Sequence, residues 1–380
     1  MPRRAIFEDE HEAFRESVRT FLHREAAPHA ERWEAEGMVD REFWRKAGAA
    51  GFVGFQAPAQ YGGLDLEDFR FNAILDEEIE YASIPGDNFA LQNDVLGPYL
   101  IELTNDEQKA RWLPGFTAGE LITAVAMSEP GAGSDLRGIA ATATPTESGW
   151  KLDGSKTFVT SGIQADLVIV AARTPAEDGH SYSLFAVEDG TPGFERGRKL
   201  DKIGRKAQDT AELFFNEVEV PRENLIGEEG SGLRMLMRNL PRERLSIAIS
   251  ATASAERALE ITLSYVKERR AFGQPIGSFQ ANRFALAELS TRVRAARVYV
   301  DHCIAAVNAG ALSDSEAAGA KAWTTELQFE VLDRCLQLHG GYGYMDEYEI
   351  SRLWRDARVQ RIYGGTSEIM LEIVGRSLGL

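Results

Sequence analysis

The residues whose types and spacing most clearly suit ligand binding lie in a glycine-containing segment. Residues 126–135 read Ala-Met-Ser-Glu-Pro-Gly-Ala-Gly-Ser-Asp. Its glycines lack side chains, so the backbone can approach a ligand and direct N–H groups toward an anion or the polar edge of a ring. A simple glycine-rich turn explains the same composition equally well. The segment is not a dinucleotide-binding G-x-G-x-x-G motif, because Leu136 stands where the third glycine is needed.

Two further glycine segments lie near the C-terminus. Residues 337–344 read Gln-Leu-His-Gly-Gly-Tyr-Gly-Tyr and follow a predicted helix, where one glycine would serve as the C-cap and three exceed that need. In residues 361–368, Thr366 or Ser367 would cap a final helix. Gly364 and Gly365 therefore precede a helix N-terminus, which favours exposed N–H donors.

Two charged segments have an ordinary structural interpretation when taken alone. Residues 240–245 (Leu-Pro-Arg-Glu-Arg-Leu) predict the solvated first turn of a long helix, with Pro241 near its first position. Residues 268–275 predict a helix end with cations in the last turn.

Composition excludes several classes of protein. The 380 residues include 42 basic and 59 acidic side chains, a net charge of −17, which argues against a nucleic-acid partner because phosphates require a basic face. No apolar run approaches the roughly 20 residues of a transmembrane segment, and the charged start lacks the apolar core of a signal peptide. Two cysteines favour the reducing cytoplasm. The absence of CxxC and HExxH predicts no metal site.

Apolar periodicity divides the chain into three stretches. Residues 1–120 are predicted helical, with Phe14, Val18 and Leu22 on one face. Residues 121–232 have the short strands of an antiparallel sheet or barrel, and Asp153-Gly154 predicts a hairpin turn. Residues 233–380 return to helix, in runs at 242–269, 282–309 and 314–338 and a final helix from 367. We therefore predict an α+β, mostly α fold in three domains.

Together and in this order, these segments resemble the signatures of the acyl-CoA dehydrogenase family, and residues 206–215 and 339–345 are similar to its long-chain branch. The resemblance implies an N-terminal helical domain (1–120), a middle β-barrel-like domain (121–232) and a C-terminal four-helix bundle (233–380). It implies bound FAD, a homotetramer built as a dimer of dimers, and α,β-dehydrogenation of a fatty acyl-CoA in fatty acid β-oxidation and lipid metabolism. The resemblance also implies that the electrons taken from the substrate pass on to electron-transfer flavoprotein.

The resemblance also implies roles for individual residues. Those that match the family's FAD contacts are Val125, Ala126, Met127, Ser128, Gly133, Ser134, Phe158, Val159, Thr160, Arg269, Phe272, Gln280, Gln337, Gly340, Gly341, Thr366, Ser367 and Glu368. Of these, Arg269, Phe272 and Gln280 resemble groups that reach FAD across a dimer interface. Substrate-side positions are Ser134, Arg244 and Gly365.

The resemblance places the catalytic base on the long helix. Many members carry a glutamate between Tyr and Gly-Thr near the C-terminus, but that position here is Gly364. The isovaleryl and long-chain branches carry the glutamate directly before an Arg-Leu pair. In this sequence that glutamate is Glu243, before Arg244 and Leu245. Burial would raise the pKa of Glu243 and suit it to remove a proton. In the family, the N–H at the position of Gly364 and a ribityl hydroxyl of the flavin stabilise the enolate oxygen.

Some residues leave the substrate and the activity open. The polar run Gln92-Asn93-Asp94 lies where relatives line the distal acyl pocket, and Arg234 stands where the long-chain branch has an aromatic residue; these residues face either the pocket or solvent. Short, branched, functionalised or carrier-protein-bound acyl groups stay possible. The alternative activities are an acyl-CoA oxidase and a flavin monooxygenase of the same fold. A non-catalytic subunit would bind no FAD tightly.

Overall fold

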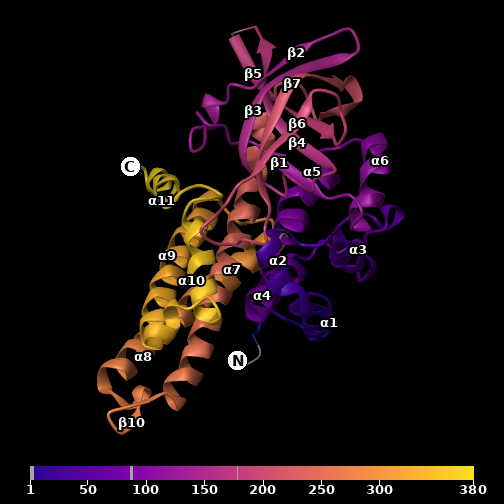
Figure 1. Cartoon of the computed structure of the whole chain (residues 1–380). Coiled ribbons are helices and arrows are strands. Elements are labelled where there is room, and N and C mark those ends of the chain that lie inside the picture. The colour runs from indigo at the N-terminus through magenta and orange to yellow at the C-terminus, as the bar shows by residue number, and fades with distance from the viewer. Residues whose placement is uncertain (1–3, 86–88, 178) are drawn as a thin grey trace.

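The computed structural model describes residues 4–85, 89–177 and 179–380, which form three parts in chain order (Figure 1). The N-terminal part is helical. Its elements are α1 (Asp9–Glu25), α2 (Ala30–Glu36), α3 (Arg41–Ala49), α4 (Phe69–Ala82), the π-helix η3 (Leu91–Leu96), α5 (Gly97–Glu102) and α6 (Asp106–Thr117).

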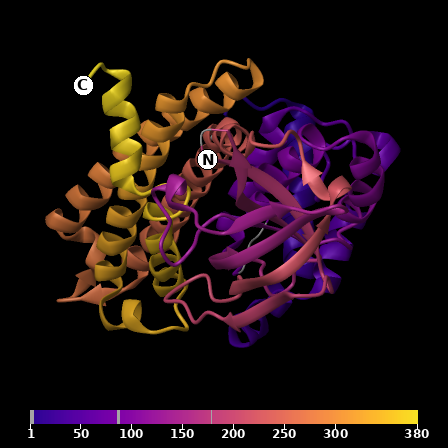
Figure 2. The same ribbon diagram turned by 90° about the horizontal axis from the view of Figure 1, so that it is seen from above.

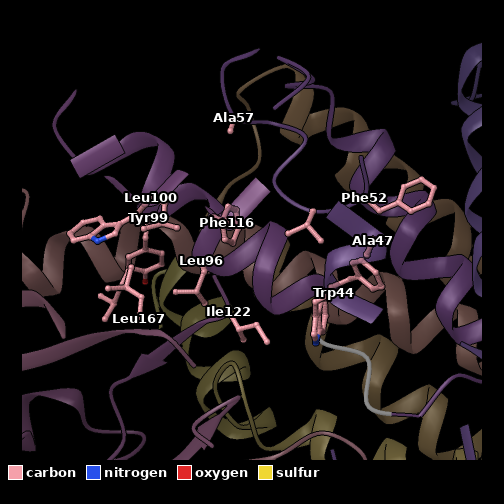
Figure 3. Close-up of a cluster of buried hydrophobic side chains, with 14 of the residues drawn as sticks. Trp44, Ala47, Phe52, Ala57, Leu96, Tyr99, Leu100, Phe116, Ile122 and Leu167 are labelled. Atoms are coloured by element: carbon pink, nitrogen blue, oxygen red, sulfur yellow. The ribbon is translucent and has the colours of Figure 1, made fainter. Parts of the chain in front are cut away.

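The predicted apolar faces of this part are confirmed. Val18 and Leu22 of α1 are buried, and Phe14 packs against the same core. That core extends through α3, where Trp44 is buried, to Tyr99 of α5 and reaches the sheet at Leu167 (Figure 3). The N-terminal helices and one face of the middle part therefore share a single apolar core.

The middle part is an eight-stranded sheet in the described chain. Its strands are β1 (Thr123–Ala126), β2 (Thr142–Pro145), β3 (Gly149–Thr160), β4 (Leu167–Ala176), β5 (Gly179–Glu188), β6 (Phe194–Lys199), β7 (Thr210–Pro221) and β8 (Leu225–Ile226). The order is β6-β7-β3-β2-β4-β5-β8, with β1 parallel to β4. Most neighbours are antiparallel, as predicted. The barrel is loose because β6 and β8, the two ends of the strand order, do not pair with each other in the described residues.

The hairpin predicted at Asp153-Gly154 is wrong. Strand β3 runs straight through these residues, and its pairing with β7 shifts register between Leu152 and Gly154. Gly154 has φ of +147°, and a Cβ there would lie 2.6 Å from that of Ala141. The glycine therefore marks a β-bulge at which another segment approaches closely. An Asp-Gly pair suits such a bulge as well as a hairpin turn.

The C-terminal part is a helical bundle that stands beside the other two parts (Figure 2). It consists of α7 (Gly232–Glu268), α8 (Gln280–Asn308), α9 (Asp314–His339), α10 (Glu349–Ala357) and α11 (Ser367–Ser377), with the short hairpin β9 (Arg270–Ala271) and β10 (Gln274–Pro275) between α7 and α8. Helix α10 packs on α7 and α9 as the fourth helix, and α11 packs on α9. Thr366 is the N-cap of α11 and accepts a hydrogen bond from the N–H of Ile369.

The predicted start of the long helix is also wrong. Helix α7 begins at Gly232, so Pro241 lies inside it and residues 240–245 are not a solvated first turn. Proline removes one backbone N–H from the helix. The carbonyl that would have accepted it belongs to Met237, whose side chain is 47% exposed. Water can reach this side of the helix, while Glu243 and Arg244 turn inward.

A buried ion-pair network joins the N-terminal part to the bundle. Arg297 of α8 donates to Glu77 of α4 at 2.7 Å and to Glu256 of α7 at 3.1 Å. Arg4 and Arg15 also pair with Glu77. Burial alone would raise the pKa of Glu77, but the charges of Arg297, Arg4 and Arg15 hold it down to about 2. This network fixes the position of α7 relative to α4.

We predict that Arg297→Met destabilises the protein strongly. The substitution leaves two buried carboxylates without their shared cation, and breaking a buried pair costs about 3–5 kcal/mol. A thermal unfolding scan checks the effect, with Arg376→Met as the control because its pair with Glu372 is exposed. Surface pairs contribute about 0–1 kcal/mol. Equal melting temperatures for the two variants would contradict a stabilising role for the network.

Candidate active site

The candidate base, Glu243, lies on the inner face of α7. Its residue exposure is 7%, and its Oε1 has no hydrogen-bond partner among the described residues. The hydroxyl of Tyr99, from α5, lies beside this carboxyl. Within the described residues this hydroxyl makes no hydrogen bond of ordinary geometry. Figure 3 shows Tyr99 within the apolar cluster of the N-terminal part. The carboxyl therefore sits in a mostly apolar surrounding with one oxygen free to accept a proton.

Burial raises the pKa of Glu243 to about 7. The charge of Arg244 and the hydroxyl of Tyr99 oppose this rise but do not cancel it. A general base is most effective when its pKa lies near the working pH. At neutral pH a substantial fraction of Glu243 is ionised, and the ionised form is more basic than an ordinary carboxylate.

Arg244 points at the glycine loop. Its Nε donates to the carbonyl of Gly364 at 3.3 Å. Lys321, fully buried in α9, donates to the carbonyl of Gly365. Gly364 and Gly365 have φ of +63° and +98°, and a Cβ on either would lie 2.5 Å from a neighbouring side chain. Two cations therefore hold two successive glycine carbonyls, in a conformation that favours glycine. Gly364 lies against Ile247, one turn of α7 after Glu243.

The candidate flavin residues of the middle part form one cluster. Strand β1 holds Val125 and Ala126, and the N–H of Thr157 in β3 donates to the carbonyl of Ser128 at 2.9 Å. This bond brings Met127 and Ser128 beside the end of β3, which carries Phe158, Val159 and Thr160. Gly133 and Ser134 are exposed in the loop that follows β1.

Two of the candidate flavin residues hold strained backbone conformations. Phe158 has φ of +58° and Phe272 has φ of +51°, a region that bulky residues rarely adopt. Their side chains are 71% and 93% exposed. Strain of this kind is found at ligand sites more than elsewhere, and an exposed aromatic ring is available to pack against a planar ligand.

The remaining flavin residues separate into two places. Thr366, Ser367 and Glu368 begin α11, next to the glycine loop. Arg269, Phe272, Gln280, Gln337, Gly340 and Gly341 are all exposed at the opposite end of α7. There the Arg269 guanidinium stacks on Tyr342 at 5.5 Å and the Tyr265 hydroxyl donates to the carbonyl of His339 at 3.3 Å. We name these six residues the far-end group.

Within one chain, the far-end group lies far from Glu243. Arg269 follows Glu243 by 26 residues along α7, which at about 1.5 Å per residue is roughly 39 Å. Figure 1 shows the same separation, with β10 and the middle part at opposite ends of α7.

The polar residues near the predicted acyl pocket differ in their exposure to solvent. Gln92, Asn93 and Asp94 are all buried in η3, so the solvent-facing interpretation is wrong for them. Arg234 is exposed and pairs with Glu228 at 3.2 Å, so it does face solvent.

Several residues of the site escaped sequence reasoning. Glu129 lies inside the first glycine segment and pairs with buried Lys156 at 2.7 Å, and it also accepts the N–H groups of Ala140 and Ala141. This pair fixes the loop on β3. A lysine within the β-rich run 150–160 is a usable signal in the sequence. Tyr99 and Lys321 give none, because the residues beside them in the structure lie far away in sequence.

The observed segments fit FAD. Cβ atoms at Gly131, Gly133, Gly340 and Gly341 would meet nothing within 4 Å, so the backbone at all four is open to a ligand. The exposed ring of Phe158 and the capped start of α11 supply an aromatic surface and N–H donors. A helical part, a loose β part and a bundle, with open glycine segments, therefore fit a flavin-dependent oxidoreductase.

Comparison with known proteins identifies the family. The N-terminal, middle and C-terminal domains of acyl-CoA dehydrogenase match residues 8–120, 124–218 and 230–379. The long-chain specific acyl-CoA dehydrogenase of pig mitochondria is 47% identical over 99% of this chain and 88% of its own length. The crystal structure of acyl-CoA dehydrogenase from Geobacillus kaustophilus is 46% identical, with a TM-score of 0.95 over 98% of this chain and 99% of that one.

A third relative was solved with the cofactor. Acyl-CoA dehydrogenase from Bacillus anthracis in complex with FAD is 31% identical, with a TM-score of 0.90 over 98% of this chain and 67% of that one. The chain belongs to the acyl-CoA dehydrogenase family. It is an oxidoreductase that uses FAD to dehydrogenate an acyl-CoA. The oxidase, monooxygenase and carrier-protein alternatives are not favoured.

We predict that Glu243→Gln raises thermal stability above pH 7. A raised pKa means that the folded state holds the proton more tightly than the unfolded state, so stability falls as pH rises from about 4.5 to about 7. The shift corresponds to about 3 kcal/mol as an upper bound. Melting temperatures of the two proteins from pH 5 to 8 check this: the advantage of the variant should grow with pH. A pH-independent difference would contradict the buried, proton-binding carboxyl.

Proposed function

We propose that Glu243 removes the α-proton of a bound fatty acyl-CoA, which becomes the trans-2-enoyl-CoA. The observation that carries this proposal is the burial of a carboxyl with a free oxygen and a pKa of about 7. Gly364 lies against Ile247, one turn of α7 after Glu243, and its carbonyl accepts from Arg244, which supports a thioester at the glycine loop that presents its α-carbon to Glu243. FAD, when bound, supplies the acceptor for the hydride that leaves the β-carbon.

The glycine loop supports the developing enolate. We assign the N–H of Gly364 as the donor to the thioester oxygen, because a glycine offers its N–H without a side chain in the way. Arg244 and Lys321 hold the adjacent carbonyls, so the donor is fixed before the reaction begins. Loss of one such donor costs about 3–4 kcal/mol of transition-state stabilisation in other enzymes. Ser134 and Gly365 complete the substrate side in this proposal.

FAD is held by two protomers in this proposal. The residues around β1, the end of β3 and the start of α11 take the flavin end, and a second copy supplies its far-end group to the rest of the cofactor. The support is the roughly 39 Å between Glu243 and Arg269 in one chain. Exposed Phe272 and Arg269 are then buried on assembly. A homotetramer built as a dimer of dimers satisfies this requirement with closed symmetry.

The cellular setting follows from the family resemblance. We assign the enzyme to fatty acid β-oxidation in lipid metabolism, with electron-transfer flavoprotein as its electron acceptor. Two buried, unpaired cysteines, Cys303 and Cys335, agree with the reducing cytoplasm. No helix in the described ranges is long and apolar enough to cross a membrane. We also place domain boundaries near residues 120 and 232, and the changes from helix to sheet and back support this assignment.

Anaerobic titration with acyl-CoAs tests the function. We predict that the flavin absorbance bleaches in the wild type and bleaches about 10²–10⁴-fold more slowly in Glu243→Gln, because a positioned base contributes a rate factor of that size. Glu260→Gln is the matched control, since Glu260 lies on the same helix with its side chain 67% exposed. Each variant is first checked for its flavin content.

Two results would contradict the proposal. Bleaching of Glu243→Gln at the wild-type rate would remove Glu243 as the base. A yellow wild type that no acyl-CoA bleaches would remove acyl-CoA as the substrate.

A further inference from the structure

A buried ion pair joins the loop after β1 to strand β3. We name residues 127–141 the flavin loop, because several candidate flavin contacts lie in it. Lys156 of β3 donates to Oε1 of Glu129 at 2.7 Å, and the two side chains are 0% and 6% exposed. Burial alone would raise the pKa of Glu129, but its hydrogen bonds to Lys156 and to backbone N–H groups hold that pKa below its usual range. Glu129 is therefore ionised at neutral pH.

The pair ties together the two ends of the flavin loop. Glu129, near the start of the loop, accepts the N–H groups of Ala140 at 2.6 Å and Ala141 at 3.0 Å, which lie at its end. Lys156 also donates to the carbonyl of Met127 at 3.1 Å. Between these ends, Cβ atoms at Gly131 and Gly133 would meet nothing within 4 Å. The loop is therefore fixed at its base and open to a ligand along its glycines.

The contacts between β3 and the flavin loop also fix the backbone before Phe158. Lys156 and Thr157 precede it directly, and the N–H of Thr157 donates to the carbonyl of Ser128 at 2.9 Å. The pairing of β3 with β7 shifts register between Lys156 and Val159, so the strand bulges here. Phe158 has φ of +58° and is 71% exposed. A strained residue persists only where its surroundings fix it, and the bonds of Lys156 and Thr157 to the flavin loop supply that constraint on one side.

We propose that Glu129 and Lys156 are positioning residues for FAD, whose pair holds the flavin loop and the ring of Phe158 in the FAD-binding arrangement before the cofactor binds. This inference rests on the part of the proposed function that assigns the flavin end to these segments, and it does not involve Glu243. A site that is already ordered avoids the entropy cost of ordering it on binding. Loss of either partner leaves a buried charge unpaired, so the loop must open to hydrate it.

Hydrogen exchange tests whether this arrangement exists before FAD binds. The intact wild-type chain is compared with and without FAD. The amides of Ala140, Ala141 and Thr157 report on the loop directly, because each donates one of its fixing bonds. We expect these amides to stay protected in the FAD-free protein, as those of β4 do. Rapid exchange of all three while β4 stays protected would show a loop that only FAD orders and would overturn the inference, with no variant required to fold.

Lys156→Met tests what the pair does for the cofactor. The dissociation constant of FAD is measured from a dilution series of the intact holoenzyme, through the fluorescence of the released flavin. We expect it to rise about tenfold or more, because FAD must then order the loop as it binds; tenfold corresponds to about 1.4 kcal/mol. The visible circular dichroism of the bound flavin should change as well, since the flavin loop and Phe158 lie differently around it.

Two controls separate positioning from a general loss of stability. Lys151→Met breaks a pair on the same strand, with Glu217 at 2.7 Å, but these side chains are 38% and 74% exposed, so it should keep the wild-type dissociation constant and dichroism. Arg297→Met removes the cation of the network between α4, α7 and α8 and should lower the melting temperature while the flavin dichroism stays unchanged. An equal change of dichroism in Arg297→Met would reduce the effect of Lys156→Met to general destabilisation and contradict the inference.

The outcomes also distinguish this inference from the proposed function. If Lys156→Met frees the amides of Ala140 and Ala141 but binds FAD as the wild type does, the loop is loosened and FAD does not use it; the inference then fails together with the assignment of the flavin end. Wild-type binding with both amides still protected overturns the inference alone. The anaerobic titration of Glu243→Gln tests the base independently of either result.

Discussion

The structure depends on one unfavourable burial, that of the Glu243 carboxyl. Removing a carboxylate from water raises its basicity, and the proton abstraction that we propose for Glu243 requires that basicity because a thioester α-proton is only weakly acidic. The same burial costs folding stability once the group ionises. A base of this kind therefore requires a scaffold stable enough to hold it in place, and the apolar core around Tyr99 together with the inner face of α7 provides that scaffold.

Helix α7 is the element through which the site is positioned. It carries Glu243, its neighbour Arg244 holds the glycine loop, and Glu256 fastens it to α8 through Arg297. Ser246 ties it to η3 through Asp94. The connections through Arg297 and Asp94 are buried, and the one from Arg244 to Gly364 is partly buried. Together they restrict how α7 lies relative to the glycine loop, η3 and α8 more than apolar packing alone would, since hydrogen bonds and ion pairs lose energy steeply when their geometry changes.

Periodicity predicted the fold because faces such as that of α1 follow directly from the spacing of Val18 and Leu22. It failed where one residue type serves two structures: Asp153-Gly154 fits a turn or a bulge, and Pro241 fits a helix start or an exposed side within a helix. The family resemblance indicated Glu243 as the base, but local composition predicted it solvated. Contacts such as Lys321 with Gly365 join residues distant in sequence, so neither period nor motif could predict them.

The most direct test of this account is the protonation state of Glu243 itself. An infrared difference spectrum between the wild type and Glu243→Gln, followed from pH 4 to 9, isolates the carboxyl band of this one residue. We expect the band to titrate with a pKa of about 7, raised from the ordinary 4.5 by burial. A midpoint near 4.5 would show a carboxyl that water reaches, and it would contradict the claim that burial makes Glu243 the base.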